Sequence, residues 1–396
     1  MMALSVAGDV AIPKLDAMVK EDAMKEVKEE EPAACNPGLV GQRHMALIRE
    51  KRLPQLHLSL PVPPRAAAQE IGVFGRRPNP AVAPAPTATK ASTPSALSSQ
   101  FRLADFEKLA VLGRGNGGTV YKVRHRETSA LYALKVQHYG DPAAAAEADV
   151  LSRTASPFVV RCHSVLPAAA SGDVALLLEL VDGGSLDSVR SRRGAFAEAA
   201  LAEVAAQALS GLAYLHARRI VHLDVKPANL LVSTAGEVKV ADFGIAKVVA
   251  RAGDHCTSYA GTSAYMSPER FDPEAHGGHY DPYAADVWSL GVTLLELFMG
   301  KYPLLPAGQR PSWAALMCAV CFGEPPVLPD GASSPELRGF VAACLQKDYR
   351  NRASVAELLA HPFVAGRDVA ASKGALRKLV ADASSPSLEC RHTLSR

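Results

Sequence analysis

Apolar and polar residues follow two different patterns in the central part of this chain. Between Phe106 and Val136 they alternate, with one glycine-rich break and one polar break, which predicts three short strands joined by turns. The apolar run that begins at Asp173 has almost no polar residues and predicts a buried strand. Asp141 and Pro142 are residue types favoured at the start of a helix, and the alanine-rich stretch after them predicts one.

Helical spacing dominates the chain after this strand-rich part. Residues 196–219 place apolar side chains at helical spacing over more than twenty positions. Residues 286–300 are apolar on nearly every side, as in a buried helix, and residues 237–244 alternate like a short strand. A small sheet followed by a larger helical part predicts an α+β fold with two lobes.

The first hundred residues have the composition of a disordered segment. Residues 1–100 contain twelve of the 28 prolines but only one aromatic residue, Phe74, so they have few large side chains with which to offset chain entropy. A linker rich in proline and alanine ends near Gln100. Residues 364–396 form a short charged tail, in which we expect one helix around residues 372–382.

Charge and cysteine content argue against several classes of protein. Forty-three Lys and Arg residues nearly balance 40 Asp and Glu residues, so we expect no nucleic-acid partner and no membrane surface as partner. The seven cysteines are scattered and odd in number, which argues against a disulfide framework. We interpret Cys318 and Cys321, the one CxxC pair, as helix-packing residues rather than as a zinc or redox site.

Targeting signals are also missing from the sequence as given. No apolar run reaches the ~18 residues that a membrane helix needs. The N-terminus lacks the basic region of a secretory signal and the arginine-rich character of a transit peptide. We therefore expect a cytoplasmic protein, with the nucleus as a second location.

A glycine-rich turn joins two of the predicted strands. Gly113, Gly115 and Gly118 have the spacing GxGxxG, and Val120 follows them. In a dinucleotide-binding fold the third glycine would begin a helix, but the residues after Gly118 are β-branched and alternate, so this turn connects two strands. A glycine hairpin can lie over a triphosphate because no side chain holds its backbone away. By itself, the pattern also fits an ordinary glycine-rich hairpin.

Five further residues have the chemistry of a phosphoryl-transfer site. The ammonium of Lys135, near the end of the third strand, can meet the α- and β-phosphates of a nucleotide, and Glu147 can hold that ammonium in an ion pair. Asp224 can orient an acceptor hydroxyl and take its proton. Asn229, five residues later, and Asp242, at the end of a strand, offer the oxygen ligands that magnesium prefers.

Taken together and in this order, these motifs resemble the eukaryotic protein kinase family from Phe106 to Phe363. The resemblance implies the bilobal kinase fold, with a small antiparallel-sheet lobe over about residues 106–181 and a larger helical lobe over about residues 182–363. It also implies ATP and Mg²⁺ as cofactors.

The same resemblance assigns roles to single residues. It implies Asp224 and Lys226 as catalytic residues and Asn229 and Asp242 as metal ligands, with Leu178 as the gatekeeper of the adenine site. The residues implied to contact the nucleotide are Leu112, Gly113, Arg114, Gly115, Asn116, Gly117, Gly118, Val120, Ala133, Lys135, Glu147, Glu179 and Val181.

Three other charged residues are structural in that family. The resemblance implies a buried ion pair between Glu269 and Arg352 that anchors the activation segment. It also implies that Asp286 braces the catalytic loop. Lys226 is typical of Ser/Thr-type architecture rather than of dedicated tyrosine kinases.

Three segments narrow the resemblance to the MAP kinase kinases. Residues 182–187 (DGGSLD) and 261–270 (GTSAYMSPER) are similar to that group, and residues 247–262 are similar to its plant type. The resemblance implies a dual-specificity kinase, which phosphorylates both Thr and Tyr in the activation loop of a MAP kinase.

The N-terminal region has a further feature of the same group. Arg49, Lys51 and Arg52 come shortly before Leu56 and Leu58, an arrangement with which such kinases dock onto their MAP kinase. The cations suit an acidic patch, and the two leucines suit an apolar groove. Exposed charge pairs contribute only ~0.2–1 kcal/mol each, so this contact should be transient. We expect the protein itself to be a monomer.

Two departures from the family pattern concern regulation. Leu223 stands where the family has an Arg that receives an activation-loop phosphate. Ala252 stands at one of two acceptor positions, so only Ser258 and its neighbour Thr257 remain for an upstream MAP kinase kinase kinase. We hypothesise that activity depends little, or differently, on dual phosphorylation.

A third departure is the short stretch between Lys135 and Glu147. It implies a short alanine-rich helix and an ion pair less secure than the metal ligands. These departures motivate one alternative, a catalytically weak kinase-fold scaffold that docks a MAP kinase. Another Ser/Thr kinase branch would leave the docking motif unexplained.

Overall fold

The computed structural model describes the region in which the sequence predicts two lobes. The described residues are 101–384, except 116–117, 138–141, 169–172, 250–260, 277, 279, 307–311 and 329–330. The predicted disordered segment, the docking motif around residues 49–58 and the end of the tail lie outside the described residues. The same is true of Asn116, Gly117, Ala252, Thr257 and Ser258.

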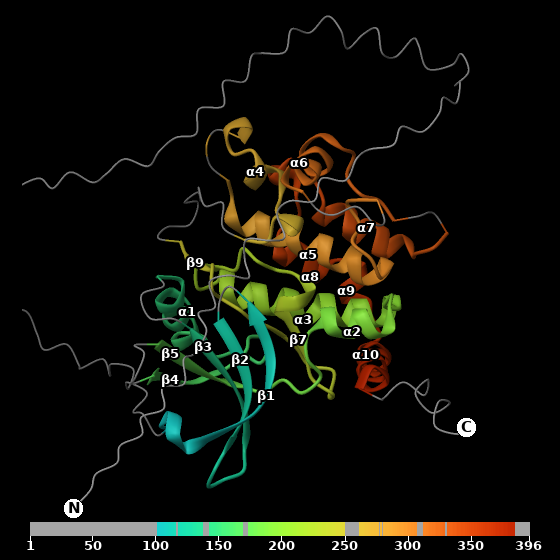
Figure 1. The fold of residues 1–396 in the computed structure, drawn as a ribbon. Helices are drawn as coiled ribbons and strands as arrows, with labels where there is room; N and C mark the ends of the chain where they lie inside the picture. Colours follow the sequence, from blue (N-terminus) through green and yellow to red (C-terminus); the bar gives the residue numbers. More distant parts are fainter. Residues whose placement is uncertain are drawn as a thin grey trace, which may run out of the picture. The chain divides into compact units, whose positions relative to one another are not determined.

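A five-stranded antiparallel sheet forms the first lobe (Figure 1). Its strands follow the order β1-β2-β3-β5-β4, and helix α1 comes between β3 and β4 in the chain. Strand β4 is missing from the sequence prediction, because its residues CHSVLPA contain a proline and do not alternate regularly. The elements of this lobe are β1 Phe106–Gly115, β2 Gly118–His125, β3 Leu131–Gln137, α1 Pro142–Ser152, β4 Cys162–Ala168 and β5 Asp173–Glu179.

Alternation along β3 separates a packing face from a cleft face. Leu134 is fully buried and packs with Phe106 and Val123 in the small core of the sheet. Its neighbours Ala133 and Lys135 belong to the other face, where they line a cavity between the sheet and the helical lobe. The period of two thus directs the lysine toward the cleft.

The second lobe is helical, and its longest helices agree with the sequence prediction. Helix α3 occupies most of residues 196–219, and α5 contains most of residues 286–300. The predicted strand over residues 237–244 is shorter than expected, because the backbone turns at Asp242, where φ is +64°. The helices are α2 Leu186–Arg193, α3 Glu198–His216, α4 Pro268–Phe271, α5 Pro282–Met299, α6 Trp313–Met317, α7 Pro335–Cys344, α8 Val355–Ala360, α9 Pro362–Ala365 and α10 Val369–Ser384.

Two pairs of short strands carry the loops at the cleft. Strand β6 (Ile220–Val221) pairs with β9 (Lys247–Val248), and β7 (Leu230–Val232) pairs with β8 (Val238–Val240). The residues between β6 and β7 and those between β8 and β9 are therefore held at both ends by strands. These two connections carry all four predicted catalytic and metal-binding residues.

Helix α5 is the centre of the helical lobe. Trp288, Leu290 and Leu295 are almost fully buried in the main core, as the apolar pattern predicts. None of the helices in the described part of the chain is both long and apolar enough to cross a bilayer. Cys318 is exposed at the start of a π-helical turn, and Cys321 is partly buried against the carbonyl of Pro268.

Candidate active site

A cavity of about 750 Å³ lies between the sheet and the helical lobe. Strands β1, β2 and β3 contribute one wall. The end of β5 and the chain after it, helix α2, Glu147 of α1 and the loops beside β7 and β8 contribute most of the rest. Every described residue that the sequence implied to contact the nucleotide lines this cavity, together with Leu178, Asn229 and Asp242. Asn116 and Gly117 lie outside the described residues.

The glycine turn has room for a ligand at two of its three motif positions. A Cβ atom added at Gly113 or Gly115 would meet nothing within 4 Å. Gly118 differs, because its φ is +107° and an added Cβ would lie 2.1 Å from the carbonyl oxygen of Val136 on β3. The third glycine therefore permits close packing of β2 on β3, while the first two leave the space above the cavity open.

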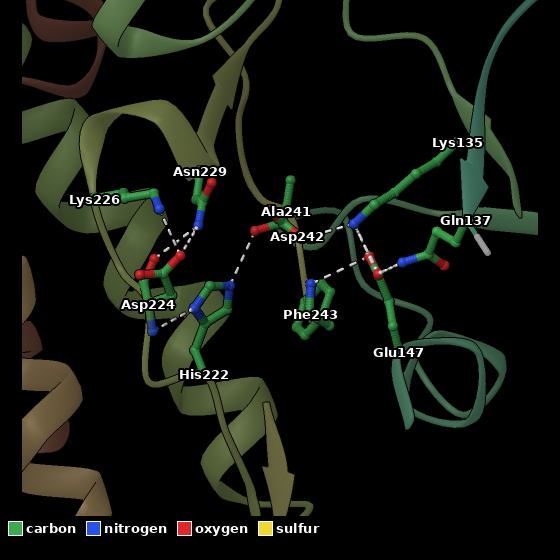
Figure 2. A network of polar contacts seen from close by, with 10 residues as sticks. All are labelled: Lys135, Gln137, Glu147, His222, Asp224, Lys226, Asn229, Ala241, Asp242 and Phe243. Carbon is green, nitrogen blue, oxygen red and sulfur yellow. Dashed lines mark hydrogen bonds and ion pairs between the residues drawn. The ribbon is translucent and has the colours of Figure 1, made fainter. Parts of the chain in front are cut away.

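Lys135 on β3 is the centre of one polar cluster at the cleft, on the right in Figure 2. Its Nζ donates to both carboxylate oxygens of Glu147, at 2.8 and 2.7 Å, and to Oδ1 of Asp242 at 2.7 Å. Gln137 Nε2 donates to Oε2 of Glu147 at 2.7 Å. The ion pair that the short helix made doubtful is thus formed, and α1 brings Glu147 to it.

The charges in this cluster keep one another ionised. Burial by itself lowers the pKa of Lys135, but the carboxylates of Glu147 and Asp242 outweigh burial and raise the pKa above its usual value. Burial likewise raises the pKa of Asp242 by itself, but Lys135 outweighs it, and the pKa lies below its usual value. Lys135 is therefore an ammonium and Asp242 a carboxylate at neutral pH.

The turn that carries Asp242 is held in place by a buried aromatic side chain. Asp242 has a left-handed backbone, which is unusual for a residue other than glycine. Phe243 is fully buried, its ring lies 5.1 Å from that of His222, and its N–H donates to Glu147 at 3.4 Å. Packing of Phe243 thus directs the neighbouring carboxylate toward Lys135.

A second polar cluster surrounds Asp224 on the connection between β6 and β7, on the left in Figure 2. Oδ2 of Asp224 accepts from Lys226 Nζ at 2.7 Å and from Asn229 Nδ2 at 2.9 Å. Oδ1 accepts from the backbone N–H of Thr262 at 3.0 Å, and Lys226 also donates to the Thr262 hydroxyl. Asp224, Lys226 and Asn229 therefore form one hydrogen-bonded group, although Asp224 and Lys226 do not line the cavity itself.

Buried groups beneath the loop hold its backbone in place. Asp286 is fully buried and accepts from the backbone N–H groups of His222 and Leu223 at 2.9 and 2.7 Å, and it contacts His216 Nε2 at 2.9 Å. Burial by itself raises the pKa of Asp286, but the hydrogen bond and charge of His216 outweigh burial and lower it. Asp286 is thus a carboxylate under the loop, where the resemblance implied a brace.

His222 links the two clusters. Its Nδ1 accepts from the N–H of Asp224 at 3.2 Å, so its Nε2 carries the proton that is donated to the carbonyl of Ala241 at 3.0 Å. Sequence reasoning did not assign roles to Gln137, His216, His222 or Thr262. Thr262 lies within residues 261–270, which resemble the MAP kinase kinases, and the other three are recognised by their contacts.

Glu269 and Arg352 form the second buried ion pair that the sequence implied. The two side chains are 0% exposed and meet through two parallel contacts of 2.7 and 3.0 Å. Arg352 also donates to the carbonyls of Gln346 and Ala284. This pair lies away from the cavity and joins the end of the activation segment to the helical lobe.

The donor atoms at the cleft fit a hard divalent cation that is completed by phosphate oxygens. The amide nitrogen of Asn229 donates to Asp224, which leaves its oxygen as the acceptor, and the Asp242 carboxylate is 46% exposed at the cavity. Among the described residues, no group of three or more His, Cys, Asp or Glu side chains could hold a metal ion. Asn229 and Asp242 offer two oxygen ligands at the cavity, and phosphate oxygens and water are the ligands that would complete the coordination of such a cation.

Comparison with known proteins agrees with this geometry. Residues 106–364 match the protein kinase domain. The chain is 51% identical to mitogen-activated protein kinase kinase 9 of Arabidopsis thaliana over 325 residues, which are 81% of this chain and 99% of that protein. It is 48% identical to mitogen-activated protein kinase kinase 7 of the same plant over 326 residues, which are again 81% and 99%.

Proposed function

Since this chain belongs to the mitogen-activated protein kinase kinases of plants and is an ATP-dependent protein kinase, we propose that it phosphorylates both a Thr and a Tyr in the activation loop of a MAP kinase. The observation that carries this proposal is the pair of polar clusters at one cleft, around Lys135 and around Asp224. The first suits the phosphates of a nucleotide, and the second suits the hydroxyl of an acceptor.

The reaction needs Asp224 and Lys226 from the cluster around Asp224, and Lys135 from the other cluster. The acceptor oxygen bonds to the γ-phosphorus, the bond from that phosphorus to the bridging oxygen of ADP breaks, and Asp224 takes the hydroxyl proton. Lys226, 2.7 Å from Asp224, places a positive charge beside the transferred group. Lys135 orients the α- and β-phosphates, held in position by Glu147.

We propose that Asn229 and Asp242 hold Mg²⁺ through the amide oxygen of Asn229 and one carboxylate oxygen of Asp242. When bound, the ion neutralises charge on the β- and γ-phosphates. Asp242 contacts Lys135 through Oδ1 only, so its other oxygen is the ligand we propose. The low pKa of Asp242 supports this role, because a metal ligand must be deprotonated.

Two contacts with other proteins belong to the same proposal. The motif of Arg49, Lys51, Arg52, Leu56 and Leu58 would tether the MAP kinase while the cleft acts on it. An upstream MAP kinase kinase kinase would act on Ser258 or Thr257. We propose the cytoplasm, and in addition the nucleus, as the place of action.

The surroundings of Leu223 support a reduced dependence on phosphorylation. Its side chain is 2% exposed and packs with Val221, Val249 and Tyr280. Leu223 itself offers a phosphate no cation, and the Arg270 guanidinium beside it donates to the Leu223 carbonyl at 2.8 Å. Burial of a phosphate against this apolar cluster would be unfavourable. The start of the activation segment is thus held at Val249 by apolar packing, which needs no phosphate.

The test uses purified full-length protein, ATP, Mg²⁺ and a catalytically inactive plant MAP kinase. We expect phosphate on both the Thr and the Tyr of the activation loop, and a rate about 10²–10⁴-fold lower for Asp224→Asn. The control variant Asp149→Asn changes an exposed carboxylate on α1 and should keep the wild-type rate. Retained binding of the MAP kinase without phosphate on either residue would overturn the proposal and favour the scaffold.

The hypothesis that activity depends little, or differently, on dual phosphorylation of this kinase is tested separately. Protein produced in bacteria and checked by mass spectrometry to carry no phosphate should already phosphorylate the MAP kinase. A preparation that is inactive until Ser258 is phosphorylated by an upstream kinase would contradict the hypothesis.

A further inference from the structure

The carboxy-terminal helix α10 is part of the helical lobe although it begins after the matched kinase domain ends at residue 364. It packs on α3 and α2 (Figure 1). Leu376, Val380 and Ala383 are buried in the main core. At its start, the buried carboxylate of Glu203 on α3 accepts from Arg367 and from the Ser372 hydroxyl at 3.0 and 3.1 Å. The helix is therefore firmly docked.

The other end of α10 reaches the segment that follows the adenine-side strand β5. Gly183 is buried, and a Cβ added there would lie 2.8 Å from Cγ1 of Val380 and 2.5 Å from the carbonyl oxygen of Val232. Arg192 of α2 donates to the carbonyl of Ala383 at 3.0 Å. Gly183 and Arg192 line the nucleotide cavity, whereas no residue of α10 does.

A second route joins α10 to the same segment through the turn between β7 and β8. The carboxylate of Asp182 accepts from the N–H and the hydroxyl of Thr234 at 2.8 and 2.6 Å. In that turn, a Cβ added at Gly236 would lie 2.8 Å from Cγ of Arg377 on α10. The turn is thus packed between Asp182 and α10, so the helix supports the segment both directly and through the turn.

We propose that α10 is a positioning element of the nucleotide site and that Val380 sets the place of residues 182–188. This segment contains two consecutive glycines, Gly183 and Gly184, and therefore has a large conformational entropy when it is unsupported. Ordering a loose segment at the moment of binding weakens affinity, and a rigid support removes that cost. Val380 acts through Gly183, since it does not itself line the cavity.

The test compares two truncations on the same face of α10. Val380→Ala removes the contact with Gly183, while Leu376→Ala removes a fully buried side chain one turn earlier. The readout is the dissociation constant of a fluorescent ATP analogue with Mg²⁺ for the full-length protein, with the melting temperature measured in parallel. This binding assay needs no MAP kinase, so its result is independent of the proposed protein substrate.

We expect both variants to melt at lower temperature, but only Val380→Ala to bind the nucleotide roughly 3- to 10-fold more weakly. Val380→Thr, which keeps the shape of the side chain, should retain wild-type affinity. Wild-type affinity in Val380→Ala, or an equal loss in Leu376→Ala, would overturn the proposal. If Val380→Ala does not fold, the same binding measurement is made on Val380→Cys, which removes one methyl branch. Wild-type affinity in Val380→Cys, or an equal loss in Leu376→Ala, would then overturn the proposal.

Discussion

Two buried ion pairs in this protein have the same chemistry but different surroundings. Lys135–Glu147 and Arg352–Glu269 each join a cation to both oxygens of a glutamate at 2.7–3.0 Å. Arg352 has backbone carbonyls as its other partners, and both members of its pair are 0% exposed. Lys135 has instead a second side-chain partner, Asp242, whose side chain is 46% exposed at the cavity.

The difference shows what separates a structural ion pair from one that can act. A pair closed on all sides can only hold its two elements together, and breaking it leaves an uncompensated charge. A pair with one exchangeable partner at a cavity can offer its cation to a ligand. Substitutions at each pair and at its partners test this contrast.

Arg352→Ala should be the most damaging change. It leaves Glu269 buried without a cation, and we expect the free energy of unfolding to fall by about 3–5 kcal/mol. Denaturant unfolding measures this loss. Arg350→Ala is the matched control, because that side chain is 70% exposed and meets Asp348 only at 4.0 Å, so a loss below about 1 kcal/mol is expected. Equal losses would show that enclosure is not what matters.

Lys135→Met should mainly affect catalysis. Loss of one preorganised positive charge at the phosphates should lower kcat/KM by roughly 10²–10³-fold. Steady-state kinetics with the MAP kinase substrate measure this. Lys108→Met is the control, because Lys108 lies over the Tyr121 ring and does not line the cavity. A rate for Lys135→Met within twofold of wild type would remove the functional half of the contrast.

Gln137→Leu should have a smaller effect on the same cluster. The variant loses one hydrogen bond to the Glu147 carboxylate, an interaction that typically contributes about 1.5–3 kcal/mol. Glu147 keeps Lys135, so we expect KM for ATP to rise, by no more than about tenfold. Gln346→Leu, which removes an exposed hydrogen bond to Ala342, should leave KM unchanged. An unchanged KM in Gln137→Leu would mean that Gln137 does not help to position Glu147.

The smallest effect concerns pH. The pKa of Asp242 is lowered in the folded state, so its contribution to stability is full above its unfolded value near 4 and is lost as pH falls through the folded value. Lys135→Met removes the cause of that lowering. The difference in unfolding free energy between wild type and variant should therefore shrink between about pH 5 and pH 3. If the difference in unfolding free energy stays constant between about pH 5 and pH 3, Lys135 is not what lowers the pKa of Asp242.

The sequence predicted the cleft better than it predicted what surrounds it. Alternation placed Lys135 on a strand face opposite Leu134, and the ordered motifs around Asp224 and Asp242 implied the residues that lie together at the cleft. The doubt over Glu147 came from the small number of residues between Lys135 and Glu147. Spacing along the chain does not show where a helix packs. Helix α1 brings Glu147 to Lys135 although the helix is short.

The sequence by itself determined the fold class, the order of the lobes and the identity of the charged groups at the cleft, because these depend on periodicity and on motifs a few residues long. Only the tertiary structure decided which partners those groups have. The contact of Val380 with Gly183 joins positions almost two hundred residues apart, and the packing of Leu223 against Tyr280 joins two loops. Such contacts arise from close packing of whole elements, which no local pattern encodes.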